Sequence, residues 1–138
     1  MKEKSHASFI IIDDDPINNM ICSQIIREAL PGAEVQVFTD PEAGIVFIHS
    51  TYSIPAAGDT ILLLDINMPI ATGWDVLNKF REFDDSVRKH MKIYMLSSSV
   101  DIHDKQKAGE YPFVLGYIEK PLTIKQVQSM TADLIKLI

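Results

Sequence analysis

The fold is decided by the stretch Ile61-Leu62-Leu63-Leu64-Asp65-Ile66-Asn67-Met68-Pro69. Its first four residues form an apolar run without a polar face, which is typical of a strand buried inside a parallel sheet with helices on both sides. Pro69 prevents the chain from continuing directly into another strand or helix. Asp65 therefore falls at the carboxyl end of a buried strand, where open α/β sheets bind their ligands. An aspartate that caps a helix or forms a turn would explain this segment equally well.

Four further apolar runs alternate with segments of helical periodicity. The predicted strands are Phe9–Ile12, Val35–Phe38, Ile61–Leu64, Ile93–Leu96 and Val114–Ile118. We expect the intervening helices to begin at Asp15-Pro16, at Thr39 or Asp40 with Pro41, after Gly73, at Asp101 and at Thr123. This alternation predicts a doubly wound α/β fold with one parallel sheet and helices on both of its faces.

The length and composition are those of one globular domain, with 138 residues, 46% of them hydrophobic and 23% charged. We expect residues 1–7 to be a short tail and residues 8–138 to form the domain. No apolar run approaches the roughly 20 residues of a membrane-spanning helix. The net charge of −6 disfavours nucleic acid as a partner. The single cysteine, Cys22, excludes an internal disulfide and favours a reducing, cytoplasmic location.

Reactive side chains follow four of the five predicted strands. They are Asp13-Asp14-Asp15 after the first strand, Asp65 after the third, Ser97-Ser98-Ser99 after the fourth and Glu119-Lys120-Pro121 after the fifth. Parallel strands end at one edge of a sheet, so the acids would meet there and repel one another unless a positive group joined them. Mg²⁺ meets this need, because it prefers oxygen ligands and often shares its shell with phosphate. Lys120 and a serine hydroxyl could bind further phosphoryl oxygens.

Such a set of groups around one carboxylate suits phosphoryl transfer onto that carboxylate. Each group taken alone also has an ordinary explanation, as a helix cap, a loop or a turn. The glycines form neither a dinucleotide-binding nor a Walker motif, so we expect no nucleotide cofactor.

Four motifs give the chain a close resemblance to the receiver domains of two-component response regulators. They are Ile11-Ile12-Asp13-Asp14, Leu63-Leu64-Asp65-Ile66-Asn67-Met68-Pro69 with Gly73, Met95-Leu96-Ser97-Ser98 and Gly116-Tyr117-Ile118-Glu119-Lys120-Pro121. The resemblance extends from about Ser8 to Ile138. It implies a CheY-like, flavodoxin-like sheet of strand order 2-1-3-4-5 and a stand-alone receiver without an output domain.

The resemblance also implies a role for each residue of the site. Asp65 would accept a phosphoryl group from a partner histidine kinase in a Mg²⁺-dependent reaction. The metal ligands would be Asp14, Asp65, the backbone carbonyl of Asn67 and, mainly through water, Asp13. Ser97 and Lys120 would bind phosphoryl oxygens, and the Lys120-Pro121 peptide bond would be cis. Asp15 matches no ligand position and is expected to cap a helix.

Phosphorylation would switch the surface through Ser97 and Tyr117. The added charge and acceptor oxygens would draw Ser97 inward, and in the family an aromatic residue at the position of Tyr117 then moves. Tyr117 would otherwise be an ordinary half-buried strand residue. The expected readout surface is formed by the fourth predicted helix, the fifth strand and the last helix.

Two other functions compete with this phosphoacceptor switch. One is a relay or phosphate sink that passes the phosphoryl group to a histidine phosphotransfer protein. The other is a phosphatase, which would want a general acid two residues after the nucleophile, where this chain has Asn67. We therefore expect no turnover enzyme. The sequence does not identify the downstream protein target, and it is compatible with both a monomer and a homodimer.

Overall fold

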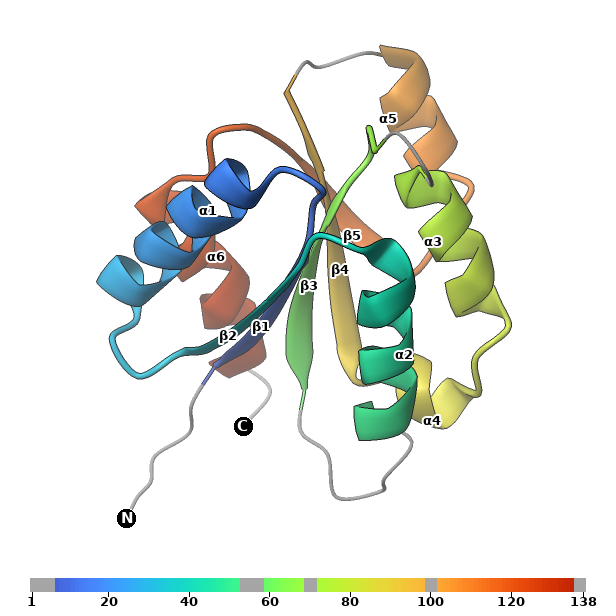
Figure 1. Ribbon diagram of the computed structural model, residues 1–138, viewed down its shortest axis with the longest axis horizontal. Coiled ribbons are helices and arrows are strands. Elements are labelled where there is room, and N and C mark those ends of the chain that lie inside the picture. The colour runs from blue at the N-terminus through green and yellow to red at the C-terminus, as the bar shows by residue number, and fades with distance from the viewer. Residues whose placement is uncertain (1–6, 53–58, 69–71, 99–101, 136–138) are drawn as a thin grey trace.

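The computed structural model describes residues 7–52, 59–68, 72–98 and 102–135 (Figure 1). Five strands form one parallel sheet: β1 (Ser8–Ile12), β2 (Glu34–Phe38), β3 (Thr60–Asp65), β4 (Met91–Ser97) and β5 (Val114–Glu119). Their order in the sheet is β2-β1-β3-β4-β5. The predicted flavodoxin-like topology is confirmed. Of the predicted tail, only Ala7 belongs to the described residues.

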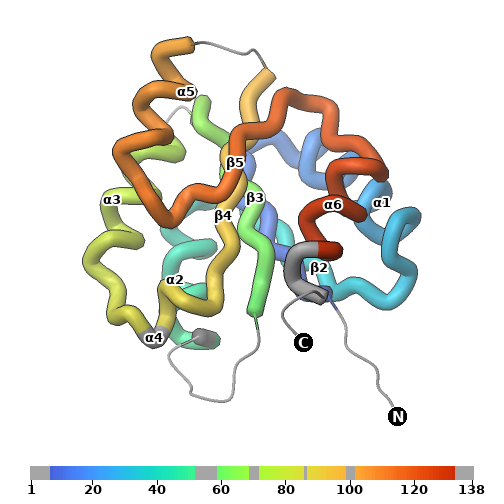
Figure 2. The backbone as a smooth tube through the Cα atoms, turned by 180° about the vertical axis from the view of Figure 1, so that it is seen from behind, coloured from blue at the N-terminus to red at the C-terminus, as the bar shows by residue number. Residues whose placement is uncertain are grey.

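Helices cover both faces of this sheet, as predicted. One face carries α1 (Pro16–Ala29) and α6 (Ile124–Ile135), and the other carries α2 (Pro41–Tyr52), α3 (Gly73–Arg81), α4 (Asp85–Arg88) and α5 (Ile102–Ala108) (Figures 1 and 2). The sequence did not predict α4, because a single turn has no apolar periodicity; it is anchored by Val87, which is buried. Among the described residues, no helix combines the length and apolar character that crossing a membrane requires.

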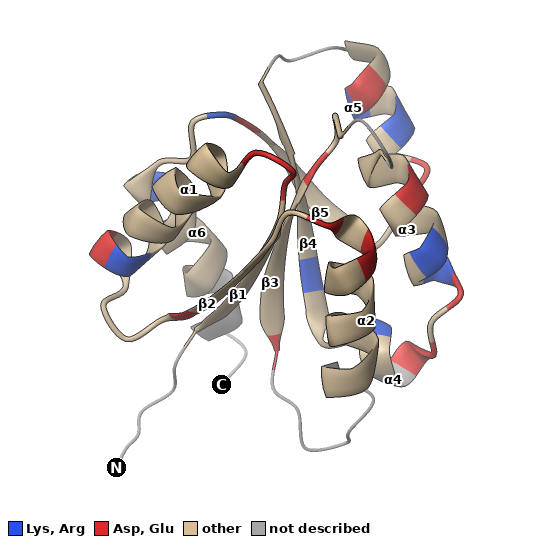
Figure 3. Cartoon of the chain, viewed as in Figure 1, with Lys and Arg blue, Asp and Glu red and all other residues tan. Residues whose placement is uncertain are grey.

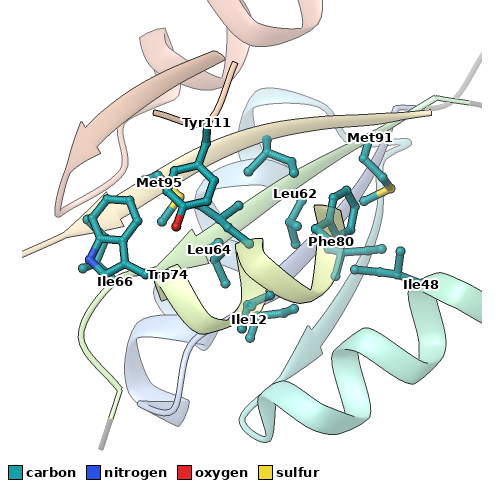
Figure 4. Packing of buried hydrophobic residues seen from close by; sticks show 14 of the residues in the cluster. Ile12, Ile48, Leu62, Leu64, Ile66, Trp74, Phe80, Met91, Met95 and Tyr111 are labelled. Atoms are coloured by element: carbon teal, nitrogen blue, oxygen red, sulfur yellow. The ribbon is translucent and has the colours of Figure 1, made fainter. Parts of the chain in front are cut away.

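The central strand β3 is buried at each of its six positions, as its unbroken apolar run predicted. Its alternate side chains belong to two separate cores. Leu62 and Leu64 pack with the residues under α2 and α3, including Phe80 and Trp74 (Figure 4). Ile61 and Leu63 pack under α1 and α6. Because burying one such side chain contributes about 1.5–3 kcal/mol, this strand holds the two layers together.

Helix ends follow local hydrogen bonding that the sequence partly predicts. Asp15 caps α1, where its side chain accepts a hydrogen bond from the backbone N–H of Ile17 at 3.0 Å. Thr123 opens α6 in a reciprocal capping pair with Gln126. Helix α3, which we expected to begin after Gly73, begins at Gly73 itself and is capped by Thr72. Asp101, the predicted cap of α5, lies outside the described residues.

The two ends of the described chain lie at the amino end of the strands. Strand β1 begins there, and α6, which runs against the direction of the strands, ends there (Figure 1). The opposite edge of the sheet is where the strands end. The predicted site residues Asp13, Asp14, Asp65, Ser97 and Lys120 belong to that opposite edge, whereas Tyr117 lies within β5.

Gly73 brings the start of α3 into direct contact with the end of β3. Its N–H donates to the carbonyl of Ile66 at 2.9 Å. A Cβ atom at Gly73 would lie 2.6 Å from the carbonyl oxygen of Asp65 and 3.0 Å from Cα of Ile66. Both atoms belong to the backbone, so the chain could relieve the clash only by moving α3 away from the strand.

We therefore expect Gly73→Ala to lower the free energy of unfolding by about 2 kcal/mol, the usual cost of overpacking. Urea unfolding followed by circular dichroism measures this change. Gly109→Ala is the matched control, because its Cβ would have its nearest contact at 3.2 Å. An equal loss in both variants would show that the contact with Asp65 is not the cause.

Candidate functional site

The carboxyl ends of four strands bring the predicted site residues together. Asp13 and Asp14 follow β1, Asp65 ends β3, Ser97 ends β4 and Lys120 follows β5. One carboxylate oxygen from each of the three aspartates lies within 4.8 Å of the others. Figure 3 shows these acidic segments meeting where β1 and β3 end. The convergence predicted from the parallel sheet is therefore present.

Lys120 supplies the positive charge between two of these acids. Its Nζ lies 2.9 Å from Oδ2 of Asp13 and 3.3 Å from Oδ1 of Asp65. Burial alone would lower the pKa of Lys120, but its hydrogen bond to Asp13 and the charges of Asp13 and Asp65 raise it. The ammonium therefore stays protonated and offsets part of the repulsion between the carboxylates.

Asp65 titrates differently from an ordinary aspartate. Burial, followed by the charge of Asp13, raises its pKa from 3.8 to about 6, against the opposing effect of Lys120. The backbone N–H of Asn67 points at Oδ1 of Asp65 from 3.4 Å. Asp65 is almost fully buried, whereas Asn67 is exposed beside it. A ligand could therefore approach the carboxylate of Asp65 from the solvent-exposed side at Asn67.

Asp13 is held by hydrogen bonds that the sequence analysis did not foresee. The N–H of Asp15 donates to its Oδ1 at 2.9 Å, and the amide of Asn18 donates to its Oδ2 at 2.7 Å. The amide of Asn19 donates to its backbone carbonyl at 2.9 Å. The first turn of a helix starting at Pro16 brings residues five and six positions after Asp13 back toward it, but no signal in the sequence marks these two amides as partners of Asp13.

Asn18 also reaches the one cysteine. Its amide lies 3.7 Å from Sγ of Cys22, which is buried as predicted. Burial, aided by the charge of Asp13, raises the pKa of the Cys22 thiol to about 11. Cys22 therefore remains a protonated, inert thiol at neutral pH.

Ser97 and Tyr117 occupy the end of β4 and the outer strand β5. Ser97 is fully buried, and its carbonyl accepts from the N–H of Lys120 at 2.7 Å. Tyr117 is half-buried and pairs with Met95 across the two strands. The Lys120-Pro121 peptide bond is cis, as the resemblance implied. The roles of Ser97 and Tyr117 in switching stay predictions.

The donor set at this edge fits Mg²⁺. It consists of carboxylate oxygens, the ligands that hard divalent cations prefer. Both carboxylate oxygens of Asp13 already accept hydrogen bonds from the chain, so Asp13 would meet a cation best through water. The resemblance implies Asp14, Asp65 and the backbone carbonyl of Asn67 as direct ligands, and Asp14 and Asp65 each have a carboxylate oxygen in the cluster. The ligand assignments stay predictions.

Comparison with known proteins identifies the family. The sequence profile of the response regulator receiver domain matches residues 9–132. This chain belongs to the response regulator receiver domain family. It is a receiver domain in fold as well, because the chemotaxis protein CheY4 of Vibrio cholerae superimposes with a TM-score of 0.74 over 94% of this chain and 98% of that one, at 22% identity.

Two solved receiver structures are more similar still. A two-component response regulator from Cytophaga hutchinsonii is 29% identical, with a TM-score of 0.85 over 96% of this chain and 99% of that one. A response regulator receiver protein from Dyadobacter fermentans is 25% identical, with a TM-score of 0.84 over 94% and 98%. The stress response regulator protein 1 of Clavispora lusitaniae is 28% identical over 127 residues. That match covers 83% of this chain but only 64% of the longer relative.

The hydrogen bond from Asn18 is expected to tune cation binding by this receiver. Asn18→Ala should weaken Mg²⁺ binding about tenfold, because partners that orient a metal-site carboxylate typically contribute that much to affinity. A titration of backbone amide chemical shifts with MgCl₂ measures the dissociation constant. Gln24→Ala is the control, since Gln24 is an exposed amide on the same helix. A lower melting temperature with unchanged Mg²⁺ affinity would show that Asn18 stabilises the fold but does not contribute to Mg²⁺ binding.

Because the pKa of Asp65 is raised, its ionised side chain destabilises the folded receiver at neutral pH. An uncharged side chain at this position would remove that cost. The folded-state pKa of about 6 lies above the ordinary 3.8, so ionised Asp65 costs stability above pH 6. That cost disappears as the pH falls through 6 toward 4, where folded Asp65 binds its proton first.

Asp65→Asn should therefore raise the free energy of unfolding by roughly 1–3 kcal/mol at pH 8 in EDTA. The gain should shrink steadily when urea unfolding is repeated at lower pH down to 4.5. Asp40→Asn, a change at an exposed aspartate, should give little difference at either pH. A gain for Asp65→Asn that does not vary with pH would contradict the assigned cause.

Proposed function

We propose that this receiver accepts a phosphoryl group on Asp65 from a phosphohistidine of a partner protein, in a Mg²⁺-dependent reaction, and signals through its protein-binding surface. The observation that carries the proposal is the meeting of Asp13, Asp14 and Asp65 with Lys120 at one edge of the sheet. Receiver domains are signalling phosphoacceptors that bind Mg²⁺ at an acidic pocket, and this chain has the matching groups.

The chemistry follows from the charges at the site. A carboxylate oxygen of Asp65 attacks the phosphorus, the phosphorus–nitrogen bond breaks, and the bonding electron pair leaves with the imidazole of the donor. Mg²⁺, when bound, neutralises the charge of the transferring phosphoryl group. Lys120 is close enough to Asp65 to pair with another phosphoryl oxygen, and it gives up part of its pairing with Asp13 to do so. The product is an aspartyl phosphate on the chain itself. The chain therefore acts as the phosphoryl acceptor and not as an enzyme with repeated turnover.

A protein donor is supported by the helix beside the site. The first two turns of α1 expose apolar side chains, with Ile17 62%, Met20 55% and Ile21 40% accessible. No charged side chain falls between Pro16 and Ile26. An exposed apolar patch of this kind favours contact with another protein. A histidine kinase or histidine phosphotransfer protein that docks there would hold its phosphohistidine over Asp65.

The output is proposed to pass through Ser97 to the surface formed by α5, β5 and α6. Ser97 ends β4, directly before the segment that leads into α5. A groove of about 170 Å³ runs along this surface between β5 and α6, with Tyr117 and Gly116 on one side and Met130 on the other. A shift of Ser97 toward a phosphoryl oxygen would change this surface and the partners it binds.

Intact mass spectrometry tests the proposal directly. After incubation with Mg²⁺ and acetyl phosphate, we expect the wild-type chain to gain one labile phosphoryl group and Asp65→Asn to gain none. Asp15→Asn is the control, because asparagine also caps helices well and Asp15 is not a proposed ligand. Retained labelling of Asp65→Asn would place the nucleophile elsewhere.

A further inference from the structure

Exposed sulfur is confined to one side chain in the described part of the chain. The sequence has six methionines and one cysteine, and of these only Met1 lies outside the described residues. Met20 is 55% exposed, whereas none of the other described methionines is more than 5% exposed: Met68, Met91, Met95 and Met130. Cys22 is buried, and burial raises the pKa of its thiol, which stays protonated. An oxidant in solution therefore meets the sulfur of Met20 before any of these others.

Met20 lies in the uncharged exposed face of α1. Met20 and Ile21 follow Ile17 by three and four positions, the spacing at which side chains of a helix lie next to each other. All three are exposed, and no residue from 16 to 26 is charged. Met20 comes five residues after Asp15, which caps the helix at the acidic edge, so roughly 8 Å of helix axis separates the two. The thioether is thus in the apolar patch that we proposed as the contact with the phosphoryl donor.

Hydrogen peroxide converts an exposed methionine to its sulfoxide. A lone pair of the sulfur forms a bond to one peroxide oxygen while the oxygen–oxygen bond breaks. The proton on the transferred oxygen passes to the departing hydroxide, which leaves as water. The thioether loses two electrons and the peroxide gains them, so a peroxide is the only co-reactant needed. Nothing has to move for this step at Met20, because its side chain is already open to solvent.

The sulfoxide would act on contacts with other proteins and not on the fold. In the free chain, water hydrates the new sulfur–oxygen dipole at the exposed Met20, and no buried residue is disturbed. When another protein covers the patch, the dipole is buried beside Ile17 and Ile21, whose side chains offer it no hydrogen-bond donor. Burying a polar group without a partner is unfavourable. Oxidation would therefore weaken the contact with a protein donor, whereas a small donor such as acetyl phosphate needs no such contact.

We propose that Met20 is a reversible oxidation site that controls which phosphoryl donors this receiver can use. Oxidation by a peroxide lowers transfer from a phosphohistidine protein, while small-molecule phosphorylation of Asp65 continues. Reduction restores the contact: the sulfoxide oxygen leaves as water, and two electrons and two protons come from a dithiol, which becomes a disulfide. This inference rests on the proposed function, because it concerns the regulation of the same site.

Peptide mapping by mass spectrometry tests the site itself. The folded chain is treated with hydrogen peroxide in EDTA, quenched with catalase and digested. We expect the peptide containing Met20 to gain one oxygen while the peptides of the four buried methionines stay unmodified. In urea that unfolds the chain, all of them should be oxidised at similar rates, because burial no longer protects them. Oxidation of a buried methionine before Met20 in the folded chain would overturn the proposed site.

Phosphoryl transfer tests the consequence of oxidation. Oxidised and untreated chains are compared with two kinds of donor: acetyl phosphate, and a panel of purified histidine kinases and histidine phosphotransfer domains phosphorylated in advance. After oxidation, the rate of labelling by acetyl phosphate should be unchanged. The rate of labelling by the protein donors should fall about tenfold, the effect of one polar group buried without a partner. Methionine sulfoxide reductases for both sulfoxide epimers, supplied with dithiothreitol, should restore that rate.

Two variants separate Met20 from the other oxidisable groups. Met20→Leu keeps an apolar side chain of similar volume, so its transfer rate should be the same before and after peroxide treatment. Met91→Leu is the matched control, because it removes a buried methionine and retains Met20. Peroxide should lower the transfer rate of this control as in the wild type. A loss of transfer in Met20→Leu after treatment would show that another group carries the effect, and the proposal would be wrong.

The outcomes distinguish this inference from the proposed function. Unchanged transfer from a protein donor after complete oxidation of Met20 would overturn the inference and leave the function standing. Absence of acetyl phosphate labelling in the untreated chain would overturn the proposed function and the inference with it. Labelling by acetyl phosphate without transfer from any protein of the panel would exclude docking of such a donor. The inference would then fail, while the phosphoacceptor role of Asp65 would remain.

Discussion

The pairing of Lys120 with Asp13 and Asp65 is the constraint on which the site depends. Two largely buried carboxylates this close together would repel strongly, and one ammonium shared at 2.9 and 3.3 Å keeps them in one place. Because burial, followed by the charge of Asp13, outweighs the opposing effect of Lys120, the pKa of Asp65 remains raised. The edge of the sheet therefore retains a net negative charge, which favours the binding of a divalent cation.

Much of the fold and site could be predicted because both depend on one-dimensional patterns. An unbroken apolar run such as Ile61–Leu64 has to be buried on both faces, and that requirement alone demands covering helices. Parallel strands then bring Asp13, Asp65 and Lys120 to one edge of the sheet, regardless of the conformation of the connecting loops. Asp15 and Thr123 could be identified as caps because their signal is local.

The rest depends on how side chains meet in space. Nothing in the sequence marks Asn18 as a partner of Asp13 rather than a surface residue of α1, because the choice is made by the angle at which the helix leaves the strand. The stacking of Trp74 on Tyr111 joins residues far apart in the chain. The short helix α4 forms around the burial of Val87, which only the packed core provides.

The placement of the two chain ends has a practical consequence for handling this molecule. Strand β1 begins, and helix α6 ends, at the amino end of the strands (Figure 1), whereas Asp65 is the last residue of β3 and lies at the carboxyl end of the strands. A fluorescent protein or an affinity anchor placed before β1 or after α6 would be joined to the described chain at the edge opposite the acidic one. The molecule can therefore be tethered to a surface by either end with its reactive side facing solution.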